Sequence, residues 1–300
     1  MAIFAIHAEK LKHVIEKPFK LEREIQALFE SNLKQVMGLT LVRSEFSIKN
    51  KRIDTLAYDE QTSAFIIIEY KRDKNISVVD QGFTYLSLML ENKADFIVEY
   101  NEQLKRNLKR DDVDWSQTRV AFVSPSFTDN QIQATNFKDI AIELWEVKRF
   151  DNNTLLVTEL KKSRSAESIK PITQQNKDLK RIADEITVYT EDALIARASA
   201  EMAELYDKFR SSILNLADDI EIVPVKSYVA FKKSSNVVDI EIQKKSLKIF
   251  INAKWGKIND SKGIARDVSQ IGHSGNGDYQ IQVTDDRDLE YIMSLVKQVL

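Results

Sequence analysis

Two carboxylates and a lysine carry the first chemistry that this sequence suggests. Glu69 and Lys71 end an apolar run, residues 64–68, and side chains alternate between the faces of a strand, so both would project beside Phe65 and Ile67. A buried charge is costly unless it is paired or binds a metal ion. The end of this strand is therefore predicted to be either a functional site or an ion pair.

Asp54 lies on the preceding strand, and the short connection at residues 59–63 brings it roughly opposite Glu69. Two converging carboxylates form the hard oxygen site that Mg²⁺ or Mn²⁺ prefers, and the waters on such ions can be delivered to a phosphodiester. Lys71 would then stabilise the negative charge that develops on the phosphate. The alternative is an ordinary ion pair between Lys71 and either Asp54 or Glu69, which needs no metal.

A further polar pair follows on a helix expected at residues 78–90. Gln81 and Tyr85 are four residues apart, so they share one helix face and could lean over the metal site. Tyr85 could equally be a core residue. Acidic-x-Lys triplets are common in this chain, and the buried strand before Glu69 distinguishes its triplet from those at 91–93, 146–148, 159–161, 178–180 and 260–262.

The elements that must position these residues follow from the hydrophobic periodicity. Residues 3–6 and 11–15 alternate like a hairpin, and the apolar spacing from Leu21 to Val36 predicts a helix that stops at Gly38. Further helices are expected at 78–90 and 129–137, and strands at 39–48, 51–58, 64–71, 95–100, 119–123, 140–147 and 155–160.

This order, with Asp54, then Glu69-x-Lys71, then Gln81-x-x-x-Tyr85, resembles the RecB-like branch of the PD-(D/E)XK nuclease superfamily. The resemblance implies an α/β fold, a restriction-endonuclease-like mixed sheet flanked by helices. It also implies a divalent-metal-dependent nuclease that hydrolyses phosphodiester bonds in nucleic acid, with DNA favoured. Asp54 and Glu69 would bind Mg²⁺ or Mn²⁺, and Lys71, Gln81 and Tyr85 would complete the catalytic set.

Relatives in this superfamily commonly add a carboxylate from the first helix, and Glu22 and Glu24 compete for that role. Glu22 is favoured as the additional metal ligand because it lies on the buried flank with Phe29 and Leu33, whereas Glu24 is expected to point toward solvent. The cations that flank the site could contact phosphates or could be ordinary surface charges: Arg52, Arg72 and Lys74.

The second half of the chain is predicted to be a separate domain. The periodicity lapses over residues 163–178, which we interpret as a linker between a nuclease-like domain, residues 1–162, and an α+β accessory domain, residues 179–300. Because no metal or nucleophile constellation is visible in the accessory domain, we expect it to dock nucleic acid or a protein partner. Its expected helices are 179–197, 202–216 and 286–299, and its expected strands are 220–225, 228–231, 237–242, 247–251 and 279–283.

The composition, 43% apolar and 30% charged, is that of a globular protein. The absence of cysteine and three scattered histidines argue against a zinc or HNH-type site, and the lack of a long apolar run predicts a cytoplasmic protein without a membrane span. A net charge of −2 still permits a local basic cleft. The alternative function is a catalytically inactive nucleic-acid-binding or scaffolding protein that retains the nuclease fold, which the intact Asp54, Glu69 and Lys71 argue against.

Overall fold

The computed structural model describes residues 2–72, 77–163, 165–173, 176–233 and 235–300, and only the backbone of Asp178. The chain divides into two compact units, Met1–Val188 and Tyr189–Leu300. Each unit has its own six-stranded sheet and its own hydrophobic core. The predicted α/β mixed sheet flanked by helices, followed by a smaller α+β unit, is confirmed.

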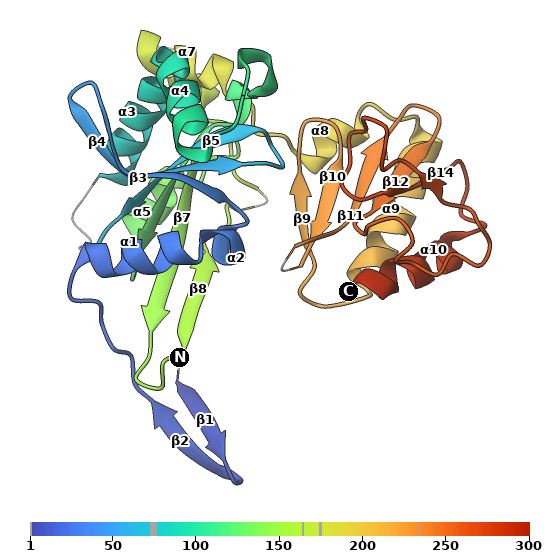
Figure 1. Ribbon diagram of the computed structural model, residues 1–300, viewed down its shortest axis with the longest axis horizontal. Helices are drawn as coiled ribbons and strands as arrows, with labels where there is room; N and C mark the ends of the chain where they lie inside the picture. The colour runs from blue at the N-terminus through green and yellow to red at the C-terminus, as the bar shows by residue number, and fades with distance from the viewer. Residues whose placement is uncertain (1, 73–76, 164, 174–175, 234) are drawn as a thin grey trace. The chain divides into compact units, whose positions relative to one another are not determined.

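The sheet of the first unit is mixed (Figure 1). Its strands are β3 (Thr40–Ile48), β4 (Lys51–Asp59), β5 (Ala64–Tyr70), β6 (Arg119–Ser124), β7 (Ile142–Arg149) and β8 (Leu155–Glu159), which lie side by side in that order. β3, β4 and β5 pair antiparallel, β5, β6 and β7 pair parallel, and β8 pairs antiparallel with β7. The parallel step from β5 to β6 requires a long crossover, and the helices after β5 provide it.

Helices cover both faces of this sheet. One face packs against α1 (Glu22–Ser31) and α2 (Leu33–Met37), and the other against α3 (Val78–Glu91), α4 (Lys93–Leu104) and α5 (Asp129–Thr135). Short 3₁₀ turns follow α4 at η1 (Arg110–Asp112) and η2 (Trp115–Gln117). Alternate residues of β5 enter the two cores, Phe65 and Ile67 toward α3, and Ile66 and Ile68 toward α1. Every residue of β5 is buried, as expected of a strand covered on both faces.

The strand predicted at residues 95–100 is wrong, because these residues belong to α4. Phe96, Ile97 and Tyr100 are buried at helical spacing, whereas Val98 is half exposed. The Phe96 ring packs against Phe46 of β3, with ring centroids 5.6 Å apart. The run of aromatic and β-branched residues favoured a strand locally, but burial at positions one and four apart requires a helix.

The segment expected to link the two domains packs on the first unit instead. It carries α6 (Lys170–Thr173) and leads into α7 (Lys177–Glu185), and the boundary between the units falls after Val188. Ile169, Ile182 and Ile186 are buried in the core that α3 faces. These apolar residues are too sparse to reveal a core face by periodicity. The helix expected at 179–197 is accordingly two helices, α7 and a short α8 (Glu191–Ile195), one in each unit.

The second unit has an antiparallel sheet in the order β13-β14-β12-β11-β10-β9. Apart from the two-residue β13, which was not expected, its strands agree with the expected ones. The helices α9 and α10 bury Phe209 and Leu295 in a core with Ile240 and Ile249. The bounds are β9 Glu221–Pro224, β10 Val229–Lys232, β11 Asn236–Ile242, β12 Leu247–Ile251, β13 Arg266–Asp267, β14 Tyr279–Val283, α9 Ala200–Leu214, α10 Leu289–Val296 and η3 Lys297–Val299.

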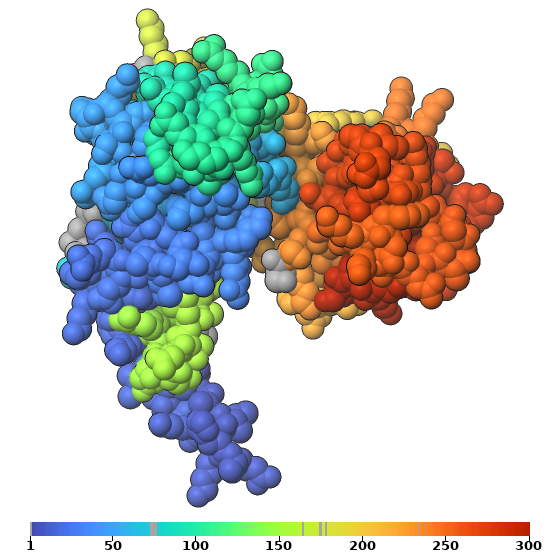
Figure 2. All heavy atoms as spheres, viewed as in Figure 1, coloured from blue at the N-terminus to red at the C-terminus, as the bar shows by residue number. Residues whose placement is uncertain are grey.

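The expected N-terminal hairpin is present as β1 (Ile3–His7) and β2 (Lys10–Val14). Its base is joined to the turn between β7 and β8, where Asp151 N donates to Ile15 O over 2.9 Å. The space-filling view shows the hairpin standing out from the first unit as a narrow arm (Figure 2). Among the described residues, no helix combines the length and the hydropathy needed to cross a membrane.

Candidate active site

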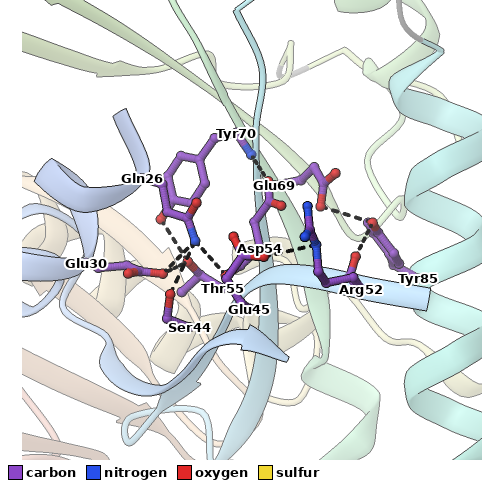
Figure 3. Close-up of polar contacts among 10 residues, drawn as sticks. All are labelled: Gln26, Glu30, Ser44, Glu45, Arg52, Asp54, Thr55, Glu69, Tyr70 and Tyr85. Atoms are coloured by element: carbon purple, nitrogen blue, oxygen red, sulfur yellow. Dashed lines mark hydrogen bonds and ion pairs between the residues drawn. The ribbon is translucent and has the colours of Figure 1, made fainter. Parts of the chain in front are cut away.

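Asp54 and Glu69 are brought together where β4 and β5 separate. The last residues paired between these strands are Thr55 and Ile68, and the register continues to Asp54 and Glu69 as the next opposed positions. Asp54 Oδ2 accepts a hydrogen bond of 3.0 Å from Tyr70 N, which fixes its carboxylate beside the end of β5. Figure 3 shows the two carboxylates lying close together between α1 and α3.

Glu69 is almost fully buried, at 5% exposure, and its charge is compensated by three side chains. Lys71 Nζ lies 2.8 Å from Oε1, which also accepts a 2.8 Å hydrogen bond from Gln81 Nε2. Tyr85 OH donates to Oε2 over 3.0 Å, and Gln81 Nε2 donates to Tyr85 OH over 3.1 Å. The sequence-predicted residues Lys71, Gln81 and Tyr85 therefore meet at Glu69.

The position of α3 allows Gln81 and Tyr85 to contact Glu69. Its first turn is capped by Ser77, whose hydroxyl accepts from Asp80 N, as the spacing of these residues predicts. Gly82 follows Gln81 and allows close approach to the sheet, since a Cβ there would lie 2.4 Å from Cδ1 of Ile142. The helix can therefore lie near enough for its polar side chains to reach Glu69.

The electrostatics distinguish Asp54 from its neighbours. Burial and the negative charge of Glu69 raise the pKa of Asp54 to about 6, and Glu45 adds to this, against the opposing effects of Tyr70 N and Lys71. Burial and Glu69 also raise the pKa of Tyr85. Tyr85 therefore stays protonated and donates to Glu69, whereas Asp54 ionises near neutral pH at an electrostatic cost.

The two first-helix candidates occupy different places. Glu22 begins α1 and is exposed, so its expected place on the buried flank of the helix is wrong. Its Oε1 accepts a 2.9 Å hydrogen bond from Arg72 N, just beyond Lys71. Glu24 is half-buried rather than solvent-directed, and its Oε2 lies 3.2 Å from Arg149 Nη2. Glu22 is thus the candidate that lies near the end of β5.

Glu22 does not join Asp54 and Glu69 in a cluster of three carboxylates among the described residues. Within the described ranges, no three or more His, Cys, Asp or Glu side chains gather as they would around a metal ion. The Oε1 of Glu22 accepts from Arg72 N, and a role of Glu22 as a ligand together with Asp54 and Glu69 stays a prediction. The candidate ligands for a cation at this site are the carboxylates of Asp54 and Glu69.

That pair does fit a divalent cation. In the part of the chain that the structure describes, Asp54 Oδ1 accepts no hydrogen bond, and Glu69 Oε2 accepts only the one from Tyr85. Mg²⁺ is commonly held by one or two carboxylates and keeps several waters. Asp54 and Glu69 could thus hold such an ion without breaking the contacts that position them.

Sequence reasoning missed a polar network between α1 and β4. The amide of Gln26 donates to Asp54 O over 2.9 Å and to Glu30 Oε1 over 3.1 Å, and Glu30 also accepts from Thr55 Oγ1 (Figure 3). The Thr55 hydroxyl reaches Tyr70 OH at 3.3 Å. The available signal was the polar stripe Glu22, Gln26 and Glu30, spaced four apart on a helix whose other face is buried.

The flanking cations have local partners. Arg52 is exposed and pairs with Glu45, 2.9 Å from Nε to Oε2, while its carbonyl accepts from Tyr85 OH at 3.4 Å. Arg72 Nη1 donates to Lys20 O over 2.8 Å. Lys74 lies outside the described residues.

Comparison with known proteins links the whole chain to one relative. It is 55% identical over 300 residues to an uncharacterized protein of Haemophilus influenzae, which covers all of this chain and 99% of that one. Residues 191–298 match a family described as a domain of unknown function, DUF5655. This match falls within the second unit.

Solved structures show only low similarity. A repair endonuclease from Pyrococcus abyssi aligns at 18% identity and a TM-score of 0.26, over 44% of this chain and 49% of that one. The apo form of EndoMS aligns at 15% identity and a TM-score of 0.29, over 49% of this chain and 64% of that one. This chain therefore spans less than two thirds of the length of either solved structure.

Proposed function

We propose that this chain, which belongs to the same family as the Haemophilus influenzae protein, is a divalent-metal-dependent nuclease that hydrolyses phosphodiester bonds, with DNA as the favoured substrate. The observation that carries the proposal is the juxtaposition of Asp54 and Glu69 with Lys71 at the end of a buried strand. The motif resemblance to PD-(D/E)XK nucleases supports the same assignment.

Each residue has a role that follows from its contacts. A divalent cation held by Asp54 and Glu69 would supply Lewis-acid stabilisation and an activated water. Lys71, with its side chain 13% exposed, would lie beside the phosphate and offset the charge that develops there. Gln81 and Tyr85 hold Glu69 in place by hydrogen bonds, so they position a ligand rather than react.

A second candidate function is a nucleic-acid-binding or scaffolding protein of the same fold without catalysis. The 2.8 Å contact of Lys71 with Glu69 favours it, because this ion pair satisfies both charges without a metal. The raised pKa of Asp54 favours the nuclease, since a purely structural site gains nothing from a carboxylate that ionises at an electrostatic cost.

A cleavage assay separates the two functions. Labelled single- and double-stranded DNA and RNA are incubated with the full chain in Mg²⁺, Mn²⁺ or EDTA. We expect metal-dependent cleavage of DNA that Glu69→Gln abolishes and that Glu24→Gln, which alters a carboxylate paired with Arg149, leaves intact. Absence of cleavage of every substrate, together with no stabilisation of the wild type by Mn²⁺, would leave the scaffold function.

A further inference from the structure

Trp255 is an exposed aromatic residue in the second unit, on the loop between β12 and β13. It is 44% exposed, whereas the ring beneath it, Tyr279, is 2% exposed. The two ring centroids are 4.5 Å apart with an interplanar angle of 34°. One side of the indole therefore rests on a buried ring while a large part of it remains open to solvent.

The turn that carries Trp255 is held by the chain around it. Trp255 N donates to Asp278 Oδ2 over 2.8 Å, and Ile258 N donates to Tyr279 OH over 3.0 Å. Lys257 N donates to Lys254 O over 3.1 Å, which closes a turn with Gly256 at φ +85°. The backbone of the turn is thus held in place and the indole rests on Tyr279, so binding to the indole costs little conformational entropy.

Two lysines lie on the same turn as Trp255, one on each side of it in the sequence. Lys254 and Lys257 are both exposed, and neither forms an ion pair among the described residues. Lys262, further along the loop, is different: its Nζ lies 2.9 Å from Asp288 and over the ring of Tyr291. The turn therefore combines an open aromatic face with two uncommitted positive charges.

From this arrangement we infer that the turn at residues 254–257 binds single-stranded nucleic acid, with a base stacked on Trp255 and the adjacent phosphates contacted by Lys254 and Lys257. Every base offers a flat aromatic face, so stacking on a fixed indole tolerates any sequence. The lysines favour a phosphodiester chain over a neutral sugar, which would use the indole but gain nothing from two ammonium groups. The inference does not depend on cleavage by the first unit.

Binding is measured in EDTA, so that no metal-dependent cleavage interferes. The full chain is titrated into a fluorescein-labelled oligothymidine of about 20 nucleotides, long enough for the site sizes typical of stacking modules, and anisotropy is recorded. We expect Trp255→Ala to weaken binding about tenfold and Trp255→Phe, which keeps a ring, to weaken it less. Ile271→Ala is the matched control, because Ile271 is 47% exposed in the same unit, and it should change nothing.

Two further readouts tie the binding to this turn. Lys254→Ala with Lys257→Ala should lower the slope of log affinity against log salt by about 1.4, whereas Lys244→Ala with Lys245→Ala, an exposed lysine pair between β11 and β12, should not. Bound DNA should quench the emission of Trp255, one of three tryptophans, and the quenching should be lost in Trp255→Phe. Equal affinity and equal quenching in Trp255→Ala, or quenching by maltohexaose and not by the oligonucleotide, would overturn the inference.

Discussion

Asp54 and Glu69 differ in what the protein provides for their charges. Glu69 is held by Lys71, Gln81 and Tyr85, whereas Asp54 accepts a single hydrogen bond, from a backbone amide, among the residues that the structure describes. Burial and the neighbouring Glu69 charge raise the pKa of Asp54, and this one hydrogen bond only partly opposes them. Of the two carboxylates, Asp54 therefore gains more from a bound cation.

Asp54→Asn is expected to stabilise the metal-free protein. Because the folded-state pKa of about 6 exceeds the ordinary aspartate value of 3.8, the folded state loses stability as pH rises from about 4 through 6, and the full cost persists above that range. Removing the charge should raise the free energy of unfolding at pH 7.5 by about 1–2 kcal/mol, allowing for partial solvation of the side chain. The gain should vanish at pH 4.

Thermal melts in EDTA at the two pH values measure this difference. Asp111→Asn, at an exposed carboxylate of the same unit, is the control and should have no effect at either pH. Addition of Mn²⁺ should stabilise the wild type at pH 7.5 and not Asp54→Asn. A variant less stable than the wild type at pH 7.5 would mean that the Asp54 charge contributes favourably to folding.

Lys71→Met should separate charge stabilisation from metal binding. The change leaves the buried Glu69 with only its Gln81 and Tyr85 hydrogen bonds, so stability should fall by about 1–3 kcal/mol. Cleavage should fall about a hundredfold or more. Stabilisation by Mn²⁺ should be larger than in the wild type, because the ammonium no longer competes for Glu69, and Lys71→Arg should restore the wild-type response. If Mn²⁺ stabilises neither protein, Lys71 and Glu69 are only an ion pair.

At the scale of the elements, the sequence could predict those contacts of the site that join strands and helices close to one another along the chain. The β4–β5 connection is short, so counting residues is enough to oppose Asp54 and Glu69. The cap at Ser77 likewise fixes where α3 begins and which face carries Gln81. The contact of Gln26 with Asp54 O spans 28 positions and depends on how α1 packs across the sheet, which no local pattern encodes.

Gln26 is therefore the position that tests the support of β4 by α1. Its buried amide satisfies the Asp54 carbonyl and the Glu30 carboxylate, so Gln26→Leu leaves both without this donor. We expect the free energy of unfolding to fall by about 1–3 kcal/mol and cleavage to decrease. Ser31→Ala on the same helix removes a hydroxyl that, among the described residues, donates only to Ala27 O, and it should lower the free energy of unfolding by less than about 1 kcal/mol. Equal losses in urea denaturation of the two variants would contradict this role.

At the scale of the whole molecule, the loss of hydrophobic periodicity after residue 162 predicted the end of the first domain there. The structure places the boundary between the two units after Val188, because later residues are buried in the core of the first unit. The expected linker and the helix α7 that follows it are mostly polar, yet Ile169 ahead of α6 and Ile182 in α7 are 7% and 3% exposed. α7 is further joined to α3 and α4 by the ion pairs of Arg181 with Glu91 and of Lys93 with Glu185. A few well-placed apolar residues can anchor a polar segment, and their partners are distant in sequence.

Fragments that end at Val188 and at Lys162 should therefore behave differently. The shorter fragment loses Ile169, Ile182 and Ile186 from its core, and burial of each contributes about 1.5–3 kcal/mol. The sum, about 4.5–9 kcal/mol, is comparable to the whole stability of a typical domain. Residues 1–188 should unfold cooperatively near the melting temperature of the corresponding transition in the full chain, and residues 1–162 should aggregate or melt without a cooperative transition.

A point substitution in the intact chain tests the same packing without truncation. Ile182→Ala should cost about 2–5 kcal/mol, because it removes a buried side chain between α7 and α3. Ile172→Ala, at a residue of α6 that is 65% exposed, is the matched control and should cost less than about 0.5 kcal/mol. Differential scanning calorimetry resolves which unit is affected, and only the transition of the first unit should move. If both variants melt like the wild type while residues 1–162 fold alone, the segment after Lys162 contributes nothing to the first unit and acts as a linker.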